Sequence, residues 1–395
     1  MTQRSSGKPI IAWISSFPVE WLPDAPEPLR QLPREHPSSW QRVLLEQLEK
    51  KTELRLHIVV LRSQFERDFT FERNGVMFHL IKTIGGWRAP SLFWQDTLLI
   101  RRKLAEIKPD AIHAWGTERG AALIAHRLNF PSVVTIQGLL TWYNQTVPPH
   151  LYGRLAGILE TYSLRRAHLI TTESNFSVQW LRRRFPKARV EQIEHAPDSI
   201  FHNVQRQPKT KPFRFLFVGT LEQRKGGDLL IQALDQLQDE MAFELIIAGN
   251  VEAGMLRALQ QRASTKLWQR VNFKKDLTPS QVAQELAAAT MMIFPTLADV
   301  SPNAVKEAVV AGVPVVGSVI GGIPDYVITG QNGVLFPAGD LTGLIEAIRA
   351  ACRHPLFSQG QVDPAVLSKM RSYLSPALMK KRFLKIYQLV CQGKH

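Results

Sequence analysis

The chain has 395 residues, 45% of them hydrophobic and 21% charged, which is an ordinary balance for a soluble globular protein. This length exceeds what one hydrophobic core holds, so we expect two domains of roughly 150–200 residues each. The net charge of +15 is spread over both halves without a zinc-finger, KH, RRM or basic-zipper pattern, which argues against a nucleic-acid partner.

The cellular compartment is suggested by the cysteines and the apolar runs. Cys352 and Cys391 form no disulfide or zinc pattern, as expected in a reducing cytoplasm. The apolar run at residues 9–15 is too short for a signal peptide or a membrane span, so we predict a strand there. Four basic clusters either cover solvated helix faces or attract an anionic membrane, which would hold the protein peripherally at the inner face. These clusters are 101–103, 165–166, 182–184 and 380–382.

Short apolar segments alternate with amphipathic helical patterns through the first half of the chain, as in parallel α/β units. Helices are predicted at residues 38–51 and 91–109, and another follows Glu118. The predicted strands are 9–15, 54–61, 76–82, 110–116, 131–137, 168–174 and 189–195.

The same alternation begins again after a polar, basic segment at residues 202–212 that is typical of an inter-domain linker. The predicted strands of this second cycle are 213–219, 243–249, 271–275, 291–296 and 313–319. Helices are predicted at 228–237, 254–267, 280–290 and 375–390. The pattern divides the chain into an N-terminal domain at 1–205, a C-terminal domain at 206–375 and a last helix at 376–395.

The most informative run is residues 294–335, where an acidic loop leads into a helix. Asp299 precedes Ser301 and Pro302, which are typical of a helix start, and Glu307 lies on that helix. Free backbone N–H groups at such a start favour an anion such as a diphosphate, and the following pair Gly321 and Gly322 permits close approach of a ligand.

This run resembles the donor half of retaining glycosyltransferases of the GT-B fold, in the group 1 family with an acidic-x7-Glu signature. The matching residues are Asp299, Ser301-Pro302-Asn303, Glu307-Ala308, Gly312 to Val316, Gly321-Gly322-Ile323-Pro324, Gly330 and Gly333. Asp299 and Asp325 stand where that family usually has Glu, which keeps the charge but shortens the reach. The resemblance implies two Rossmann-like, doubly wound parallel-sheet domains facing a central cleft, with the last helix crossing back to the N-terminal domain.

The resemblance also implies roles on the donor side. Glu307 would bind the ribose hydroxyls and Asp299 the transferred sugar, while Arg224 and Lys225, in a loop after a strand, would neutralise the departing diphosphate. Such cations do the work of a metal ion, and the sequence has no DxD motif, so neither a metal nor another cofactor is expected. The backbone around Ser301, Pro302, Asn303 and Ala304 would hold the sugar or phosphate, and Gly219, Thr220 and Gly249 would lie near the nucleotide.

The acceptor side is less well defined. His113, at the end of a strand, either orients a substrate or is a packing residue. Gln137, followed by Gly138, occupies the usual histidine position of the family, and an amide there can hydrogen-bond a sugar but cannot titrate. Ser174 and His195 are two further candidates.

We therefore expect a retaining, metal-independent glycosyltransferase that uses a UDP-, GDP- or ADP-sugar. Its acceptor would be a glycan, a lipid-linked or a small-molecule hydroxyl, and cell-envelope polysaccharide synthesis is one setting. Two alternatives stay open, because Gln137, Asp299 and Thr220 depart from the family pattern. They are a catalytically impaired GT-B protein that binds or scaffolds, and a sugar-nucleotide epimerase or hydrolase.

Overall fold

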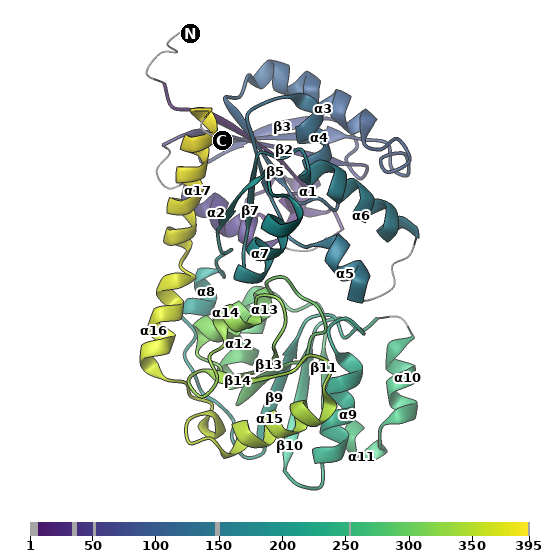
Figure 1. Cartoon of the computed structure of the whole chain (residues 1–395), viewed down its shortest axis with the longest axis vertical. Coiled ribbons are helices and arrows are strands. Elements are labelled where there is room, and N and C mark those ends of the chain that lie inside the picture. Colours follow the sequence, from purple (N-terminus) through teal and green to yellow (C-terminus); the bar gives the residue numbers. More distant parts are fainter. Residues whose placement is uncertain (1–6, 34–37, 50–52, 147–150, 253, 394–395) are drawn as a thin grey trace. The chain divides into compact units, whose positions relative to one another are not determined.

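The computed structural model describes residues 7–33, 38–49, 53–146, 151–252 and 254–393, which form two compact units (Figure 1). Unit 1 holds the described residues of Met1–Glu173, Ser177–Glu194 and Met379–His395. Unit 2 holds those of Ser174–Phe176 and His195–Leu378. Each unit is built on one sheet of buried, mainly parallel strands, which confirms the predicted pair of parallel-sheet α/β domains.

Unit 1 contains an eight-stranded sheet in the order β3-β4-β2-β1-β5-β6-β7-β8. Its strands are β1 (Ile10–Ser15), β2 (Arg55–Arg62), β3 (Phe69–Arg73), β4 (Val76–Lys82), β5 (Ala111–Trp115), β6 (Ser132–Thr135), β7 (Leu169–Thr172) and β8 (Arg189–Gln192). All neighbours pair in parallel except β3, which runs antiparallel to β4. We did not predict β3, because this edge strand is largely exposed and lacks an apolar run.

The helices of unit 1 lie between these strands. They are α1 (Glu27–Arg30), α2 (Ser39–Glu49), α3 (Trp94–Ile107), α4 (Ala121–Leu128), α5 (Leu140–Thr146), α6 (Leu151–Leu164) and α7 (Asn175–Arg184), with a short 3₁₀ turn at Val19–Trp21. Residues 50–51, the predicted end of the second of these helices, lie outside the described residues. The first two residues of α7 belong to unit 2.

The last helix, α17 (Pro376–Cys391), belongs to unit 1 from Met379 onward. Its Tyr387 hydroxyl accepts a hydrogen bond from Trp13 Nε1 at 2.9 Å and contacts His113 Nδ1 at 2.8 Å. Trp13 and His113 are paired on β1 and β5, so α17 covers the face of the sheet that carries them. Residues 394–395 of the predicted final helix lie outside the described residues.

Unit 2 contains a six-stranded parallel sheet in the order β11-β10-β9-β12-β13-β14. Its strands are β9 (Phe213–Val218), β10 (Phe243–Ala248), β11 (Val271–Lys274), β12 (Met291–Phe294), β13 (Val315–Ser318) and β14 (Gly333–Phe336). Its helices are α8 (Ser199–His202), α9 (Gly227–Leu237), α10 (Met255–Arg262), α11 (Thr265–Trp268), α12 (Pro279–Ala288), α13 (Asn303–Ala311), α14 (Ile323–Tyr326), α15 (Leu341–Arg353) and α16 (Pro364–Tyr373), with a 3₁₀ turn at Phe357–Gln359.

Two local predictions in unit 2 differ from the structure. The single helix expected at 254–267 is divided into α10 and α11, because the Ser264 side chain accepts a hydrogen bond from Leu267 N and starts a new helix. The segment 202–212 is not a detached linker. Arg206 donates to the carbonyl oxygens of Ala287 and Ala289 at the end of α12, which ties this segment to unit 2.

The boundary between the units accordingly lies before His195, whereas the sequence pattern placed it after residue 205. No helix among the described residues is both long enough and apolar enough to cross a membrane.

Candidate functional site

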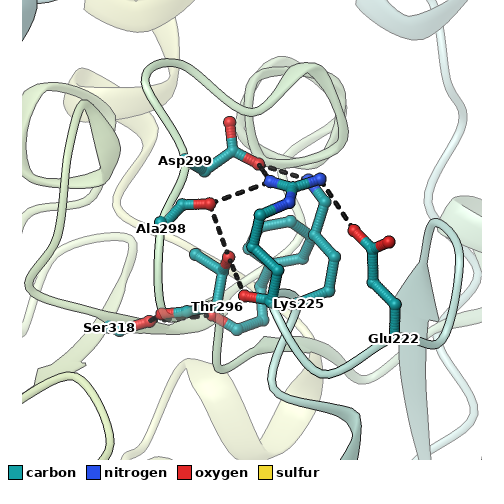
Figure 2. Close-up of polar contacts among 8 residues, drawn as sticks. Glu222, Lys225, Thr296, Ala298, Asp299 and Ser318 are labelled. Carbon is teal, nitrogen blue, oxygen red and sulfur yellow. Dashed lines mark hydrogen bonds and ion pairs between the residues drawn. The ribbon is translucent and has the colours of Figure 1, made fainter. Parts of the chain in front are cut away.

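The loops that follow β9 and β12 meet at the carboxyl end of the unit 2 sheet, where open α/β sheets bind their ligands. Two hydrogen bonds to the Arg224 carbonyl join the loops: the backbone Leu297 N donates at 2.8 Å and the Thr296 side-chain Oγ1 donates to the same oxygen at 3.0 Å. Ser318 Oγ, at the end of β13, donates to the Thr296 carbonyl at 2.6 Å and supports the second loop from below (Figure 2).

Gly226 allows the first loop to lie this close to the second. Its φ is +74°, a left-handed conformation that L side chains rarely adopt. A β-carbon there would lie 2.7 Å from the Pro295 carbonyl carbon and closer still to the carbonyl oxygen. The glycine therefore fixes the position of the two cations that precede it.

Those cations converge on one carboxylate. Lys225 Nζ forms an ion pair with Asp299 Oδ2 (Figure 2). Arg224 NH1 lies 3.9 Å from the same oxygen. Arg224 also donates to the Ala298 carbonyl at 2.9 Å and to Glu222 Oε1 at 2.7 Å. All three charged groups of the predicted catalytic set are partly accessible, with side-chain exposures of 28%, 17% and 10% for Arg224, Lys225 and Asp299. An anion entering here would meet two cations held by neutral and acidic partners.

Helix α13 begins at the end of the loop that carries Asp299. Pro302 is the N-cap and Asn303 the first helical residue, so the helix starts one residue later than predicted. Ser301 does not cap it, because its hydroxyl bonds to the Tyr326 hydroxyl at 2.7 Å and is buried. The N–H groups of Asn303 and Ala304 lie in the first turn of α13, where an α-helix has no intrahelical partners for its donors. They therefore suit an anion.

Glu307 lies on the same helix and is partly buried. Burial raises the pKa of its carboxyl to about 7, and the nearby Lys306 opposes the shift while Asp198 adds to it. A carboxyl that changes charge near neutral pH is unusual on a structural helix. Such perturbed groups are candidates for ligand binding.

The glycines at the ends of β9 and β10 lie against each other. Gly249 has a φ of +155°, and a β-carbon on it would lie 2.6 Å from the Gly219 carbonyl carbon. A β-carbon on Gly219 would meet nothing within 4 Å, so the space beside this residue is open. Thr220, next in the chain, is exposed. The three residues leave an unobstructed surface at this edge of the sheet.

On unit 1, a second polar cluster lies at the carboxyl ends of β5 and β6. The Glu118 carboxylate lies over two glycines. A β-carbon on Gly116 would clash with its Oε2, and a β-carbon on Gly138 would lie 3.2 Å from its Oε1. A β-carbon on Gly116 would also lie 3.1 Å from Gln137 Oε1, so the carboxylate and the amide share this position. Among the described residues, the buried Gln137 Nε2 has no hydrogen-bond partner. Tyr143 borders the cluster beside Gly138.

Glu118 was not among the predicted site residues. Burial raises the pKa of its carboxyl to about 7, and the charge of Glu160 adds to the shift while backbone hydrogen bonds oppose it. Glu160 itself is buried and accepts hydrogen bonds from Thr117 Oγ1 and from the N–H groups of Leu140 and Thr141, which start α5. The available signal for Glu118 was its place two residues after a strand-end glycine.

Three predicted residues lie elsewhere. His113 is fully buried, and its two ring nitrogens contact Tyr387 and Thr135 Oγ1, so it is a packing residue of the unit 1 sheet and not an accessible catalytic group. Ser174 and His195 are both buried in unit 2. Ser174 lies against Gly322, where a β-carbon would approach its Cβ to 2.8 Å, so it supports the loop after β13.

Among the residues that the structure describes, no cluster of three or more His, Cys, Asp or Glu side chains has the arrangement of a metal site.

Comparison with known proteins gives a consistent picture. The family model for glycosyl transferases group 1 matches residues 212–354, and the model for the glycosyl transferase 4-like domain matches residues 38–195. Glycogen synthase from Mycobacterium tuberculosis is 27% identical over 265 residues, which are 65% of this chain and 64% of that enzyme. The match thus spans a little under two thirds of the relative's length. D-inositol 3-phosphate glycosyltransferase 1 from Catenulispora acidiphila is 28% identical over 169 residues, or 40% of this chain and 38% of that one.

Solved structures share the fold over nearly the whole chain. Sucrose-phosphate synthase from Thermosynechococcus elongatus aligns with a TM-score of 0.77 at 16% identity, covering 98% of this chain and 100% of that one. The Anabaena protein HepE in complex with UDP-glucose aligns with a TM-score of 0.67 at 16% identity, covering 96% and 99%.

Proposed function

Because the chain belongs to the group 1 glycosyltransferases and has the GT-B fold, we propose that it transfers a sugar from a nucleoside diphosphate sugar to an acceptor hydroxyl. The transfer retains the anomeric configuration and needs neither a metal ion nor another cofactor. The observation that carries the proposal is the convergence of Arg224 and Lys225 on Asp299, directly before the start of α13.

The chemistry follows from where charge develops. Breaking the bond between the sugar and the diphosphate leaves negative charge on the leaving oxygen, and cations fixed nearby lower the energy of that transition state. Lys225 and Arg224 supply the positive charge, while the first turn of α13 supplies N–H donors. Asp299, which holds Lys225 in the free protein, contacts the transferred sugar once the diphosphate engages the lysine.

The donor we favour first is a UDP-sugar, because the similar HepE structure contains UDP-glucose; GDP- and ADP-sugars are the other candidates. Glu307 accepts hydrogen bonds from the ribose hydroxyls. The nucleotide fits beside Gly219, Thr220 and Gly249. On unit 1, Gln137 and Glu118 hold the acceptor, whose class is a glycan, a lipid-linked sugar or a small molecule. The amide of Gln137 has an unused donor for this purpose.

A thermal-shift panel tests the proposal. We expect one nucleoside diphosphate and its sugars to raise the melting temperature. At a ligand concentration a hundredfold above Kd, binding should add about 2.7 kcal/mol to the free energy of unfolding. The shift should be the same with and without EDTA. In a transfer assay, rapid turnover should require an acceptor, which separates a transferase from an epimerase or hydrolase. A protein that binds no nucleoside diphosphate at all would not be a sugar-nucleotide enzyme.

A pH dependence is predicted from Glu307. With a pKa of about 7, its carboxyl is mostly protonated at pH 6 and mostly ionised at pH 8. If the carboxylate accepts hydrogen bonds from the ribose hydroxyls, the donor KM should fall about tenfold as the pH rises from 6 to 8, in proportion to the increase in the ionised fraction of Glu307. The Glu307→Gln variant should bind the donor weakly at both values and lose this dependence. A pH dependence that survives in the variant would assign the titration to another group.

The same group gives a linked stability signal. Its ordinary pKa of 4.5 is raised in the folded protein, so the folded state holds the proton more tightly than the unfolded chain does. The contribution of Glu307 to stability should therefore decline as the pH rises from 4.5 to about 7 and stay level above that. The difference in melting temperature between the wild type and Glu307→Gln, measured over this range, isolates the effect from other carboxyls.

A further inference from the structure

The exposed apolar side chains of this protein are gathered in one part of unit 1. Among the described residues, nine of the eleven large apolar side chains that are exposed lie within residues 84–107, 116–129 and 138–168. We call the exposed side chains of these three segments the α3–α4–α6 face. Its most exposed members are Trp87 at 65%, Leu151 at 84% and Ile158 at 65%. Monomeric soluble proteins rarely expose large contiguous apolar patches, and such patches mark sites of interaction with proteins, ligands or membranes.

The three segments lie side by side. Helix α4 contacts both α3 and α6, and Figure 1 shows the three helices as neighbours on unit 1. The Arg127 guanidinium of α4 lies 4.2 Å from the ring centroid of Trp94 on α3. On its other side, His126 of α4 lies 5.9 Å, ring to ring, from Tyr162 of α6. The apolar side chains therefore belong to one surface.

The charge on this face is almost wholly positive. The three segments contain nine Lys and Arg residues and four acidic residues. Asp96 and Glu160 are buried and Glu118 is partly buried. Glu106 is the one exposed carboxylate among the described residues of these segments, and it pairs with Lys103 at 2.5 Å. A partner that docks on the α3–α4–α6 face should therefore carry negative charge.

Helix α6 combines both properties. Leu151, Ile158 and Tyr162 are exposed at helical spacing along it, and Arg154 and Arg165 are exposed between and beyond them. A groove of about 550 Å³ beside the helix is lined by these arginines, Ile158 and Tyr162. Arginine with aromatic and aliphatic side chains on one helix is the composition of a segment that lies in the interface of a bilayer.

We propose that the α3–α4–α6 face docks on the surface of an anionic phospholipid bilayer. The arginines contact the lipid phosphates, and the exposed Trp, Leu, Ile and Tyr side chains enter the boundary between headgroups and acyl chains. The face matches such a bilayer in both charge and polarity, since a lipid surface has negative phosphates directly above an apolar layer. This surface is separate from the residues that we propose for the donor, so its test does not depend on the transferase activity.

Flotation of the full chain with vesicles tests the inference. We expect the protein to float with vesicles of equal parts phosphatidylcholine and phosphatidylglycerol, but not with phosphatidylcholine alone, and to dissociate at high salt. The Arg154→Glu/Arg165→Glu variant should bind at least about 30-fold less tightly, because each basic side chain near an anionic surface contributes about a fivefold attraction. The Leu151→Ser/Ile158→Ser variant should lose binding at unchanged charge.

The matched control is Lys381→Glu/Lys385→Glu, two exposed positions on α17. It makes the same change in net charge on α17, which Figure 1 shows on the other side of unit 1 from α6, so it should bind like the wild type. Equal loss of vesicle binding in the control, or no binding of the wild type to anionic vesicles, would overturn the inference.

Sedimentation velocity tests whether a second copy of the chain occupies this face instead of a membrane. If the wild type is a dimer and Leu151→Ser/Ile158→Ser is a monomer, the face joins two copies of the chain instead. A thermal melt checks that each variant is folded.

Discussion

Replacing Lys225 with Met should lower kcat by about 100- to 1000-fold, the usual cost of removing one group that stabilises charge in a transition state. The lysine is positioned by Gly226 behind it and by Asp299 in front of it, and its ammonium lies 5.1 Å from the Phe294 ring centroid. Because the negative charge of the leaving diphosphate grows as the bond breaks, kcat should fall more than the donor KM rises. Steady-state kinetics with the donor found in the thermal-shift panel measures both constants.

The control for this prediction is Lys266→Met. Lys266 is on the same unit and pairs with Asp239, but both side chains are largely exposed and distant in sequence from the loops of the site. Its removal should leave kcat and KM unchanged. The melting temperature of Lys225→Met should also stay near that of the wild type, because partly exposed ion pairs contribute about 0–1 kcal/mol. If Lys225→Met has normal kcat, the lysine does not act on the leaving group.

Replacing Gly226 with Ala should destabilise unit 2 by about 2–5 kcal/mol, through a left-handed backbone and overpacking. The methyl group would overlap the Pro295 carbonyl, which is backbone and cannot rotate away. The loop that carries Arg224 and Lys225 must then separate from the loop that carries Asp299. We therefore expect both a lower melting temperature, by roughly 5–15 °C, and loss of transfer activity.

Gly254→Ala is the matched control, because Gly254 has a similar φ of +82° but a β-carbon there meets nothing within 4 Å. It should show only the backbone cost of about 1–2 kcal/mol and keep its activity. The difference between the two variants measures the overlap with Pro295 alone. Equal melting temperatures for both variants would show that the two loops are not held as closely as the structure has them.

Much of the fold was predictable because buried parallel strands leave a strong signal. Strand β9 was expected at 213–219 and β10 at 243–249, and both lie within one residue of those bounds, since strands covered on both faces are continuous apolar runs. Edge strand β3 lacks that signal. Asn74 and Gly75, both with positive φ between β3 and β4, are the turn residues of a two-residue hairpin and were the available clue.

The candidate site was predictable in part for a similar reason. The residues around Asp299 and Glu307 are contiguous in sequence, so their order alone suggested one loop and one helix. His113 could be interpreted in two ways, because a strand-end histidine looks the same in sequence whether it points to a ligand or to a helix. The structure decides for packing, since α17, far along the chain, covers it.

The sequence by itself determined the local features. These are the strand and helix segments, the glycine that follows Lys225, the acidic loop and the group 1 signature. Only the tertiary structure decided which of them meet. It joins Lys225 to Asp299 across 74 positions, brings Glu118 beside Gln137, and gathers the exposed apolar side chains of α3 and α6 on one face. The physical reason is that local propensity and periodicity act over a few residues. Contacts between distant segments depend on the order of the strands and on the packing of the helices between them.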